Sequence, residues 1–402
     1  MIRCLKADFT TSKEDLDRLF DCNRLSAEIW NKCLDVVKQY RKANNGKWIA
    51  NKDLQKHLKG LFPLHSQSVQ AVGERYCDAR AATKEARAKG FKDNKYPWRH
   101  KKNYPTRWKQ GIKYDGCTIL LPMGGRGKKR RKPIVVKITK SVHEFLQDKT
   151  IKVIDLIWSG RLMLAICFDD KIPAEKSHGT VCAGIDLGEI HSVCAANEEG
   201  QAVIITGRKL RAIHRFRNMK LAEISRKQSK CSKGSRRWKK LQRAKRYMLN
   251  KNDAQVRDTT HKITKSFVDW ALENHVKHVY CGNPEGVERN TASERKEHGK
   301  KARTKKVAQK LSNWNFGLTS KYLEYKLKQK GIAFEMISEA YSTQTCPKCG
   351  KRHKPEGRTY RCECGYVAHR DVHGAMNILS LGLYERIQYI GEIQHTKYLR
   401  SA

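Results

Sequence analysis

The spacing of hydrophobic residues changes along the chain and divides it into a helical and a strand-rich part. Between Lys13 and about Arg87, apolar residues recur mostly at three- and four-residue steps, the period of one helix face; they are Leu16, Leu19, Phe20, Cys22 and Ile29. From Lys113 the period becomes two, which is typical of strands. We therefore expect helices over 13–87, a short strand within 1–10, and strands at 118–121, 134–140, 151–158 and 161–168.

Turn and linker signals arrange these elements into domains. Residues 159–160 (Ser-Gly) are typical of a hairpin turn, and the proline-containing segment 171–177 is typical of a linker. The N-terminal strand and the later strands together predict a small β-barrel into which the helices are inserted. We therefore expect a barrel formed by residues 1–12 and 110–177, interrupted by a helical domain at 13–109.

The net charge of the chain indicates what kind of molecule it binds. The chain has 84 Lys and Arg residues against 40 Asp and Glu residues, which gives a formal net charge of +44. A charge of this size repels itself unless a polyanion neutralises it, so we expect nucleic acid and exclude an ordinary enzyme for a small neutral substrate. A membrane is not expected as the partner, because the sequence has no run of about 18 apolar residues.

The 14 cysteines separate into two groups. Ten are scattered singly, as is usual in a reducing cytoplasm. Secretion is not expected, because no apolar segment typical of a signal peptide follows Met1. The other four form two close pairs, each followed by glycine; they are Cys346, Cys349, Cys362 and Cys364. Such pairs build tetrahedral thiolate sites, so we expect a structural zinc ion with no open position. The second pair has one intervening residue where two are usual.

One strongly basic segment is a candidate for contact with nucleic acid. Residues 208–257 contain 19 Lys or Arg residues against two acids, and their apolar residues fall on one helical face. A solvated helix face is the alternative, but so many cations favour a polyanion contact. The basic residues expected to bind are Arg236, Arg237, Lys239, Lys240 and Arg243. A second basic stretch, 289–306, lacks an apolar period and is expected to be a loop.

The segment from Lys92 to Lys109 interleaves aromatic and basic residues. Its aromatic residues include Trp98, Tyr104 and Trp108. This pattern is typical of base stacking combined with phosphate contact, so all three residues are candidates for nucleic-acid binding. It is equally compatible with an irregular loop whose aromatic side chains pack against the domain.

Three acidic residues lie at the ends of predicted elements in distant parts of the chain. Asp186 ends a buried strand, Glu285 lies in the polar turn after another apolar strand, and Asp371 lies at a predicted helix start. Each has an ordinary explanation, as a turn residue or as an acid that the helix dipole favours. Carboxylates from distant segments can instead converge on Mg²⁺, and two such ions clamp the attacking and leaving oxygens of a phosphodiester.

The order of these motifs resembles TnpB, a family of transposon-encoded, RNA-guided nucleases related to the compact type V CRISPR effectors. The resemblance covers about residues 178–380, whereas residues 1–177 match only in layout. Besides the basic helix, the motifs that carry it are Gly184–Gly188, Gly282–Gly286, Thr343–Cys346 and His369–Ala375.

The resemblance implies an α+β multidomain fold and a guide-directed activity. The barrel would be wedge-like and the inserted helices a recognition domain, followed by a RuvC- or RNase H-like α/β nuclease domain at 178–341 and 366–392. A zinc ribbon would occupy 342–365 and a tail 393–402. The implied partners are a guide RNA and target DNA, cut beside a short adjacent motif with Mg²⁺, for which we expect two ions. We expect a monomer with one RNA, in the prokaryotic cytoplasm and associated with the nucleoid.

The resemblance also assigns the acids. Asp186 matches the first catalytic acid of the family and Asp371 the third. The second acid usually ends the middle strand, where this sequence has Gly282. We expect Glu285 in this role, because its turn leaves the same strand end. Glu324 is the reserve candidate, although its helix favours a solvent-side position for it.

Two other functions account for parts of the pattern. A guide-dependent binding protein that no longer cuts would explain the unusual second motif. A guide-independent transposase or resolvase would explain a nuclease fold alone. Co-purification of RNA separates the guided proteins from the third class, and target cleavage separates the first two.

Overall fold

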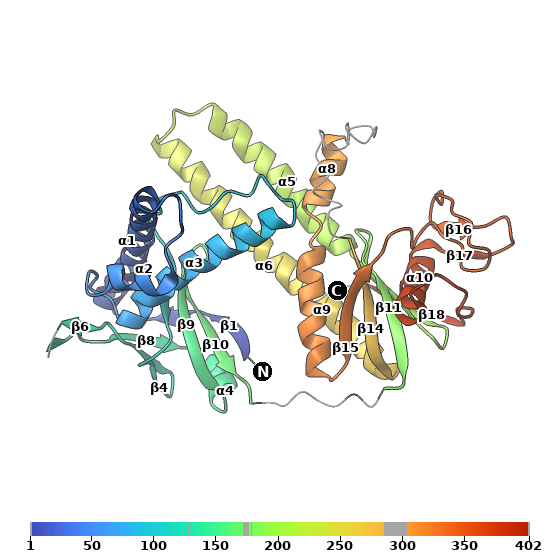
Figure 1. Ribbon diagram of the computed structural model, residues 1–402, viewed down its shortest axis with the longest axis horizontal. Coiled ribbons are helices and arrows are strands. Elements are labelled where there is room, and N and C mark those ends of the chain that lie inside the picture. The colour runs from blue at the N-terminus through green and yellow to red at the C-terminus, as the bar shows by residue number, and fades with distance from the viewer. Residues whose placement is uncertain (1, 127–128, 172–176, 178, 285–303, 401–402) are drawn as a thin grey trace. The chain divides into compact units, whose positions relative to one another are not determined.

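The computed structural model describes residues 2–126, 129–171, 177, 179–284 and 304–400 (Figure 1). The chain divides into two compact units, unit 1 (Met1–Ile172) and unit 2 (Pro173–Ala402). This division lies close to the expected boundary between the barrel and the nuclease domain. Among the described helices, none combines the length and the apolar character that a bilayer span requires.

Unit 1 combines helices with two antiparallel sheets. Its helices are α1 (Lys13–Ala43), α2 (Asn51–Leu58), α3 (Ser66–Ala88) and α4 (Lys140–Leu146). One sheet contains, in order, β1 (Ile2–Ala7), β10 (Leu162–Asp169), β9 (Thr150–Trp158) and β3 (Thr106–Trp108). The other contains β2 (Phe9–Thr10), β8 (Ile134–Ile138), β5 (Thr118–Leu121) and β4 (Lys113–Asp115). A short ribbon pairs β6 (Gly125–Arg126) with β7 (Lys129–Arg130).

The helices and strands expected in unit 1 are confirmed, but the strands are divided between two sheets. Among the described strands, hydrogen bonds do not close these sheets into the expected barrel. Helices α1 to α3 and both sheets instead pack around one hydrophobic core, which includes Leu19, Trp108 and Ile154. The hydrophobic pattern therefore predicts the positions of the helices and strands in the sequence. The pairing of the strands depends instead on how the two sheets pack against the helices.

Unit 2 is built on one six-stranded sheet with helices on both faces (Figure 1). The strand order is β15 (Ala333–Ser338), β14 (Val276–Asn283), β11 (Val181–Asp186), β12 (His191–Asn197), β13 (Gln201–Thr206) and β18 (His395–Arg400). The helices are α5 (Arg208–Ser229), α6 (Arg236–Glu273), α8 (Lys305–Ser312), α9 (Phe316–Gln329) and α10 (Arg370–Tyr384). A small hairpin pairs β16 (Thr359–Arg361) with β17 (Val367–His369).

Side chains of the central strands alternate between two buried faces. On β11, Ala183 and Ile185 belong to the core formed with α6 and α9. Cys182, on the same strand, belongs to the core formed with α10. Because successive side chains of a strand point to opposite faces, Asp186 shares the α10 face with Cys182. Burial on both faces also explains why these strands are apolar along most of their length.

The C-terminal segment differs from the expectation. Strand β18 pairs in parallel with β13, from Gln201 opposite His395 to Thr206 opposite Arg400. The prediction of a tail at 393–402 is therefore wrong. Strand β18 lies at an edge of the sheet and most of its side chains are exposed, so it lacks the hydrophobic alternation that reveals a half-buried strand.

Helices α5 and α6 form the basic segment that the sequence indicates. The Gln228 and Gln242 side chains are hydrogen-bonded at 2.9 Å, and Asn252 Nδ2 donates to the Ile213 carbonyl at 3.3 Å. The two helices therefore run antiparallel in contact. Ser235 is the N-cap of helix α6, because its Oγ accepts a hydrogen bond from the backbone N–H of Trp238.

Candidate active site and cysteine centre

Asp186 lies at the end of β11, on the face that packs against α10. Two glycines allow this helix to approach the strand closely. A Cβ on Gly184 would lie 2.2 Å from the Ala375 carbonyl oxygen, and a Cβ on Gly374 would lie 2.8 Å from Asp186 Oδ2. A side chain at Gly184 would force the helix away from β11, and a side chain at Gly374 would displace the Asp186 carboxylate. The strand-end acid and the helix-start motif are thus brought together by close backbone packing.

Asp371 lies in the first turn of α10, where the helix dipole favours a negative charge. Its Oδ2 lies 2.6 Å from His191 Nδ1, and Arg358 Nη1 donates to the same oxygen at 3.1 Å. Its charge also acts on the proton affinity of Asp186. The two acids that the sequence selected from distant segments are therefore close enough to interact.

A third carboxylate, which the sequence analysis did not select, belongs to Glu339. This residue directly follows β15, the strand beside β14. A Cβ on Gly282 would lie 2.8 Å from Glu339 Oε2, so the glycine leaves room for the carboxylate. Strands β11 and β14 run parallel, and Ile185 pairs with Cys281. The next residues of the two strands, Asp186 and Gly282, therefore lie side by side. Glu339 thus brings a carboxylate from the neighbouring strand to the space beside Gly282, the position at which the family pattern has its second acid.

The grouping of these carboxylates changes their proton affinity. Burial, followed by the charges of Glu339 and Asp371, raises the pKa of Asp186 to about 8. Burial raises the pKa of Glu339, and its Oε2 has no hydrogen-bond partner among the described residues. Raised pKa values mean that negative charge here is unfavourable without a compensating cation. The donor set fits a divalent cation, because hard cations prefer carboxylate oxygens.

The sequence offers two other candidates for the second acid, Glu285 and Glu324. Glu285 lies outside the described residues, so its role stays a prediction. Glu324 is exposed on α9, as the pattern of its helix indicates. A sequence signal for Glu339 did exist, because it ends an apolar strand just before the motif Thr343–Cys346.

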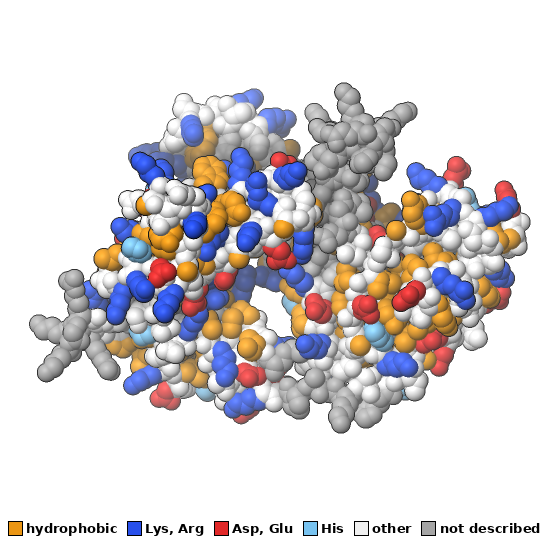
Figure 2. Space-filling view, viewed as in Figure 1, with side chains coloured by type: hydrophobic (Ala, Val, Ile, Leu, Met, Phe, Trp, Pro, Cys, Tyr) orange, Lys and Arg blue, Asp and Glu red, His pale blue; other side chains and the backbone are white. Residues whose placement is uncertain are grey.

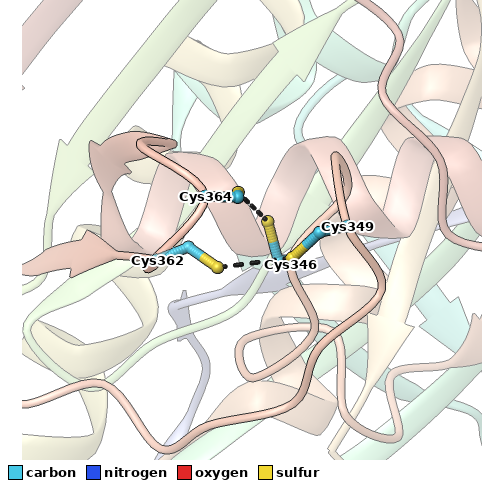
Figure 3. Close-up of side chains that lie close together, drawn as sticks. All are labelled: Cys346, Cys349, Cys362 and Cys364. Carbon is cyan, nitrogen blue, oxygen red and sulfur yellow. Dashed lines mark hydrogen bonds between the residues drawn. The ribbon is translucent and has the colours of Figure 1, made fainter.

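The four cysteines expected to bind zinc converge (Figure 3). Cys346 Sγ lies 3.6 Å from Cys364 Sγ. Cys349 Sγ lies 3.4 Å from Cys362 Sγ, and all four sulfurs lie within 4.8 Å of one another. This donor set can hold a tetrahedral ion such as zinc, with no position left for a substrate.

Buried contacts join the cysteine centre to α10. Asn377 Nδ2 donates to the carbonyl oxygens of Ser342 at 2.6 Å and Thr345 at 2.8 Å. The Tyr360 ring stacks on His373, with centroids 3.9 Å apart. Both contacts end on the helix whose first turn carries Asp371, so this helix supports the ribbon and the carboxylate site together.

The basic residues proposed for nucleic-acid binding lie on the exposed side of α6. All five are exposed, whereas Trp238 between them is half-buried; they are Arg236, Arg237, Lys239, Lys240 and Arg243. Their exposure is compatible with phosphate contact, and their role stays a prediction. Figure 2 shows many Lys and Arg side chains on the face of the molecule in view.

The aromatic segment of unit 1 separates into exposed and buried residues. Trp98 is 61% exposed and is therefore available for stacking. Tyr104 is half-buried and packs against Trp30, with ring centroids 4.9 Å apart. Trp108 is fully buried, and its Nε1 donates to the Pro122 carbonyl at 2.9 Å. Since no base can reach it in the core, the prediction that Trp108 binds nucleic acid is wrong.

The regions that carry these sites match known sequence families. Residues 316–378 match a family described as "Cas12f1-like, TNB domain", and residues 165–288 match one described as "Probable transposase". TnpB-like protein MJ0751 of Methanocaldococcus jannaschii is 27% identical over 216 residues, which cover 52% of this chain and 70% of that protein. The CRISPR-associated endodeoxyribonuclease Cas12f2 of a Micrarchaeota archaeon is 26% identical over 225 residues, which cover 53% of this chain and 38% of that protein.

A solved structure shares the fold. The protein in the cryo-EM structure of a Cas12f1–sgRNA–target DNA complex has a TM-score of 0.64 to this chain at 15% identity. The match covers 91% of this chain and 83% of that one, and at this identity it shows the fold alone. The family matches and the named relatives confirm the resemblance to the TnpB family, and the structure match confirms the mixed α and β multidomain fold.

Proposed function

We propose that this chain is an RNA-guided DNA endonuclease that cleaves target DNA next to a short adjacent motif. The observation that carries the proposal is the grouping of the Asp186, Glu339 and Asp371 carboxylates at one end of the sheet of unit 2. The names of its relatives support it, because one is a TnpB-like protein and another is a CRISPR-associated endodeoxyribonuclease. The fold is shared with a protein solved in complex with an sgRNA and target DNA.

In this proposal the three carboxylates would hold Mg²⁺, and we expect two ions. Bound divalent cations supply Lewis-acid stabilisation of the attacking and leaving oxygens of a phosphodiester. The protein's own contribution is to present the carboxylate oxygens from rigid elements: β11, the end of β15 and the start of α10. Glu339 takes the role of the second acid, in place of the expected Glu285.

The cysteine centre has a structural role in this proposal. Four cysteine ligands complete the coordination of a zinc ion, so the ion would fold the ribbon rather than act on DNA. The hydrogen bonds of Asn377 then connect the folded ribbon to α10. The ribbon thereby helps to hold Asp371 at its place in the sheet domain.

Guide RNA and target DNA are the polyanions that this basic chain requires. The exposed cations of α6 would contact phosphates, and the exposed Trp98 of unit 1 is a candidate for stacking on a base. We propose a monomer bound to one guide RNA. It would act in the prokaryotic cytoplasm, on DNA of the nucleoid.

The proposal is tested with the full-length protein purified together with its bound RNA. Sequencing that RNA identifies the guide, and a library of the matching target with randomised flanks identifies the adjacent motif. We expect Mg²⁺-dependent cleavage of the matching target. A target with an unrelated sequence but the same flank is the matched control, and it should remain uncut.

Two results would contradict the proposal, and each identifies a different protein. Guided binding of the target without cleavage in either Mg²⁺ or Mn²⁺ would identify an RNA-guided binding protein. Cleavage that does not depend on RNA would identify a guide-independent nuclease such as a transposase or resolvase.

A further inference from the structure

His191 is a buried histidine that contacts one of the three carboxylates. It begins β12, is 7% exposed, and places Nδ1 2.6 Å from Asp371 Oδ2. Arg358 binds the same oxygen at 3.1 Å. Among the described residues, the hydrogen bonds to this carboxylate thus fall on Oδ2, and Oδ1 receives none.

Two neighbouring rings hold the imidazole in place. Tyr398, on β18, meets the His191 ring edge-on, with centroids 5.8 Å apart and an interplanar angle of 87°. His369 lies on another side, with centroids 5.6 Å apart. Strand β13 pairs with both β12 and β18, so the C-terminal strand of the sheet brings Tyr398 to the histidine. These ring contacts therefore restrict the orientation of the imidazole independently of its hydrogen bond to Asp371.

The contacts favour a hydrogen-bonding role for His191 over a metal-ligating one. Donor atoms of His191, His369 and Asp371 lie within 4.8 Å of one another, a spacing that a metal could use. However, His191 Nδ1 is already hydrogen-bonded to Oδ2, and the Arg358 guanidinium contacts that oxygen. A cation at Oδ2 would meet this positive charge. An imidazole that donates from Nδ1 instead fixes the direction of the carboxylate, as partners of metal ligands commonly do.

We propose that His191 is a positioning residue for the Asp371 carboxylate, supported by Tyr398 of strand β18. By holding Oδ2, His191 leaves Oδ1 as the oxygen available to a divalent cation. This inference rests on the proposed function for the identity of the site. It concerns the affinity of the site for a cation, however, and that affinity can be measured without cleavage.

The test compares two amides at residue 191 in the full-length protein freed of RNA. In His191→Asn, the side-chain NH₂ takes the place of Nδ1 and keeps the donor. In His191→Gln, the NH₂ lies one bond further out, near the place of Nε2, and the donor is misplaced. Binding of Mn²⁺ is followed by the electron paramagnetic resonance signal of the free ion. Binding elsewhere on the chain is subtracted with Asp186→Asn.

The matched control is His278→Gln, because His278 lies on β14 of the same sheet, opposite Cys182 and away from the strand end that carries Asp186. We expect His191→Gln to weaken Mn²⁺ binding by about 10- to 100-fold, the usual cost of losing a hydrogen-bond partner of a metal ligand. His191→Asn should retain most of the affinity, and His278→Gln all of it. Tyr398→Leu should weaken binding by a smaller factor than His191→Gln, because it removes support and not the donor.

Equal Mn²⁺ affinity in the wild type and His191→Gln would overturn the proposal. Equal weakening by the Asn and Gln substitutions would also overturn it, because the imidazole itself would then be the ligand or a packing residue. A protein that shows the expected order of affinities but never cuts its guided target would refute the proposed function and leave the positioning role supported. The two inferences can therefore fail separately.

Discussion

The cysteine centre and the carboxylate site lie in the same unit but are assembled in different ways. The cysteines belong to one segment, from Cys346 to Cys364, and their sulfurs converge through the turns of a small ribbon. The carboxylates of Asp186, Glu339 and Asp371 come from three separate elements and converge only when sheet and helix are packed. A local site of this kind obtains its order from the metal, whereas a distributed site obtains it from the tertiary fold.

Each site should therefore be sensitive to a different perturbation. Loss of zinc should unfold the ribbon while the sheet that carries Asp186 and Glu339 persists. Loosening of the packing of α10 against β11 should separate the carboxylates while the cysteines continue to bind their ion. Substitutions can therefore be chosen that disrupt one of the two sites and leave the other intact.

The largest loss of stability is expected when a cysteine of the metal site is substituted. Cys362→Ser should release zinc and unfold the ribbon, because metal binding contributes on the order of 10 kcal/mol to the folding of such modules. Zinc content by mass spectrometry and proteolysis within the ribbon measure this. Cys231→Ser is the matched control, since this single cysteine lies outside the cluster. A wild-type protein purified without chelators that contains no zinc would show that the assignment is wrong.

The second effect concerns the carboxylates themselves. Asp186→Asn and Asp371→Asn should each lower the cleavage rate by a factor of about 10³ or more, because each removes a ligand of cations that stabilise the transition state by several kcal/mol. Target binding should be unchanged or slightly tighter, since negative charge is removed beside a polyanion. Single-turnover cleavage and a filter-binding assay separate the two quantities. Glu335→Gln, an exposed acid on β15, should cut normally.

If both aspartate variants cut at the wild-type rate, the distributed site is not the active site. Zinc content should be unchanged in both variants, because neither residue is a ligand of the cysteine centre. A loss of zinc together with cleavage would show that the two centres are less independent than their assembly suggests.

A smaller effect is expected when the packing is loosened. Gly184→Ala places a Cβ 2.2 Å from the Ala375 carbonyl oxygen, and overpacking of this kind costs about 1–3 kcal/mol. Unit 2 should therefore unfold at a lower temperature and cleavage should fall, while zinc stays bound. Gly317→Ala, on α9, is the control, because its Cβ would meet no atom within 4 Å. Equal melting temperatures for the two variants would contradict the close approach of α10 to β11.

The smallest effect is expected from substitutions in the basic segment of helices α5 and α6. Each phosphate contact contributes about 0.9 to the slope of log affinity against log salt concentration, so Arg236→Ala should reduce the slope by up to that amount. Lys262→Ala is the control, because Lys262 is paired with Asp258 on the same helix at 3.3 Å. Both metal centres should remain intact in these variants. An unchanged slope for Arg236→Ala would remove this residue from the nucleic-acid surface.

The parts of the two centres that sequence reasoning found are those with a local signature. The cysteine pairs are recognised by spacing alone. Asp186 follows an apolar strand and precedes a glycine turn, and Asp371 begins a helix, so each is marked by its neighbours in the chain. The helices and most strands of unit 1 were predictable for the same reason, because their hydrophobic periods are local.

The parts that were missed depend on partners far away in the sequence. Glu339 fills the space that Gly282 leaves on the neighbouring strand. His191 contacts a carboxylate 180 residues later. Trp108 lies in a segment of aromatic and basic residues that is typical of a nucleic-acid contact, but in the structure it is enclosed by the sheets and helices of unit 1. In each case tertiary packing, which no local pattern records, decides the role of the residue.

The most direct test of this account is the single-turnover cleavage rate of Glu339→Gln, loaded with the same guide as Glu285→Gln and Glu324→Gln. We predict that cleavage is lost in Glu339→Gln while target binding is unchanged, and that the other two variants cut at nearly the wild-type rate. Loss of cleavage in Glu285→Gln, with wild-type cleavage by Glu339→Gln, would contradict the account and return the second acid to the turn after β14.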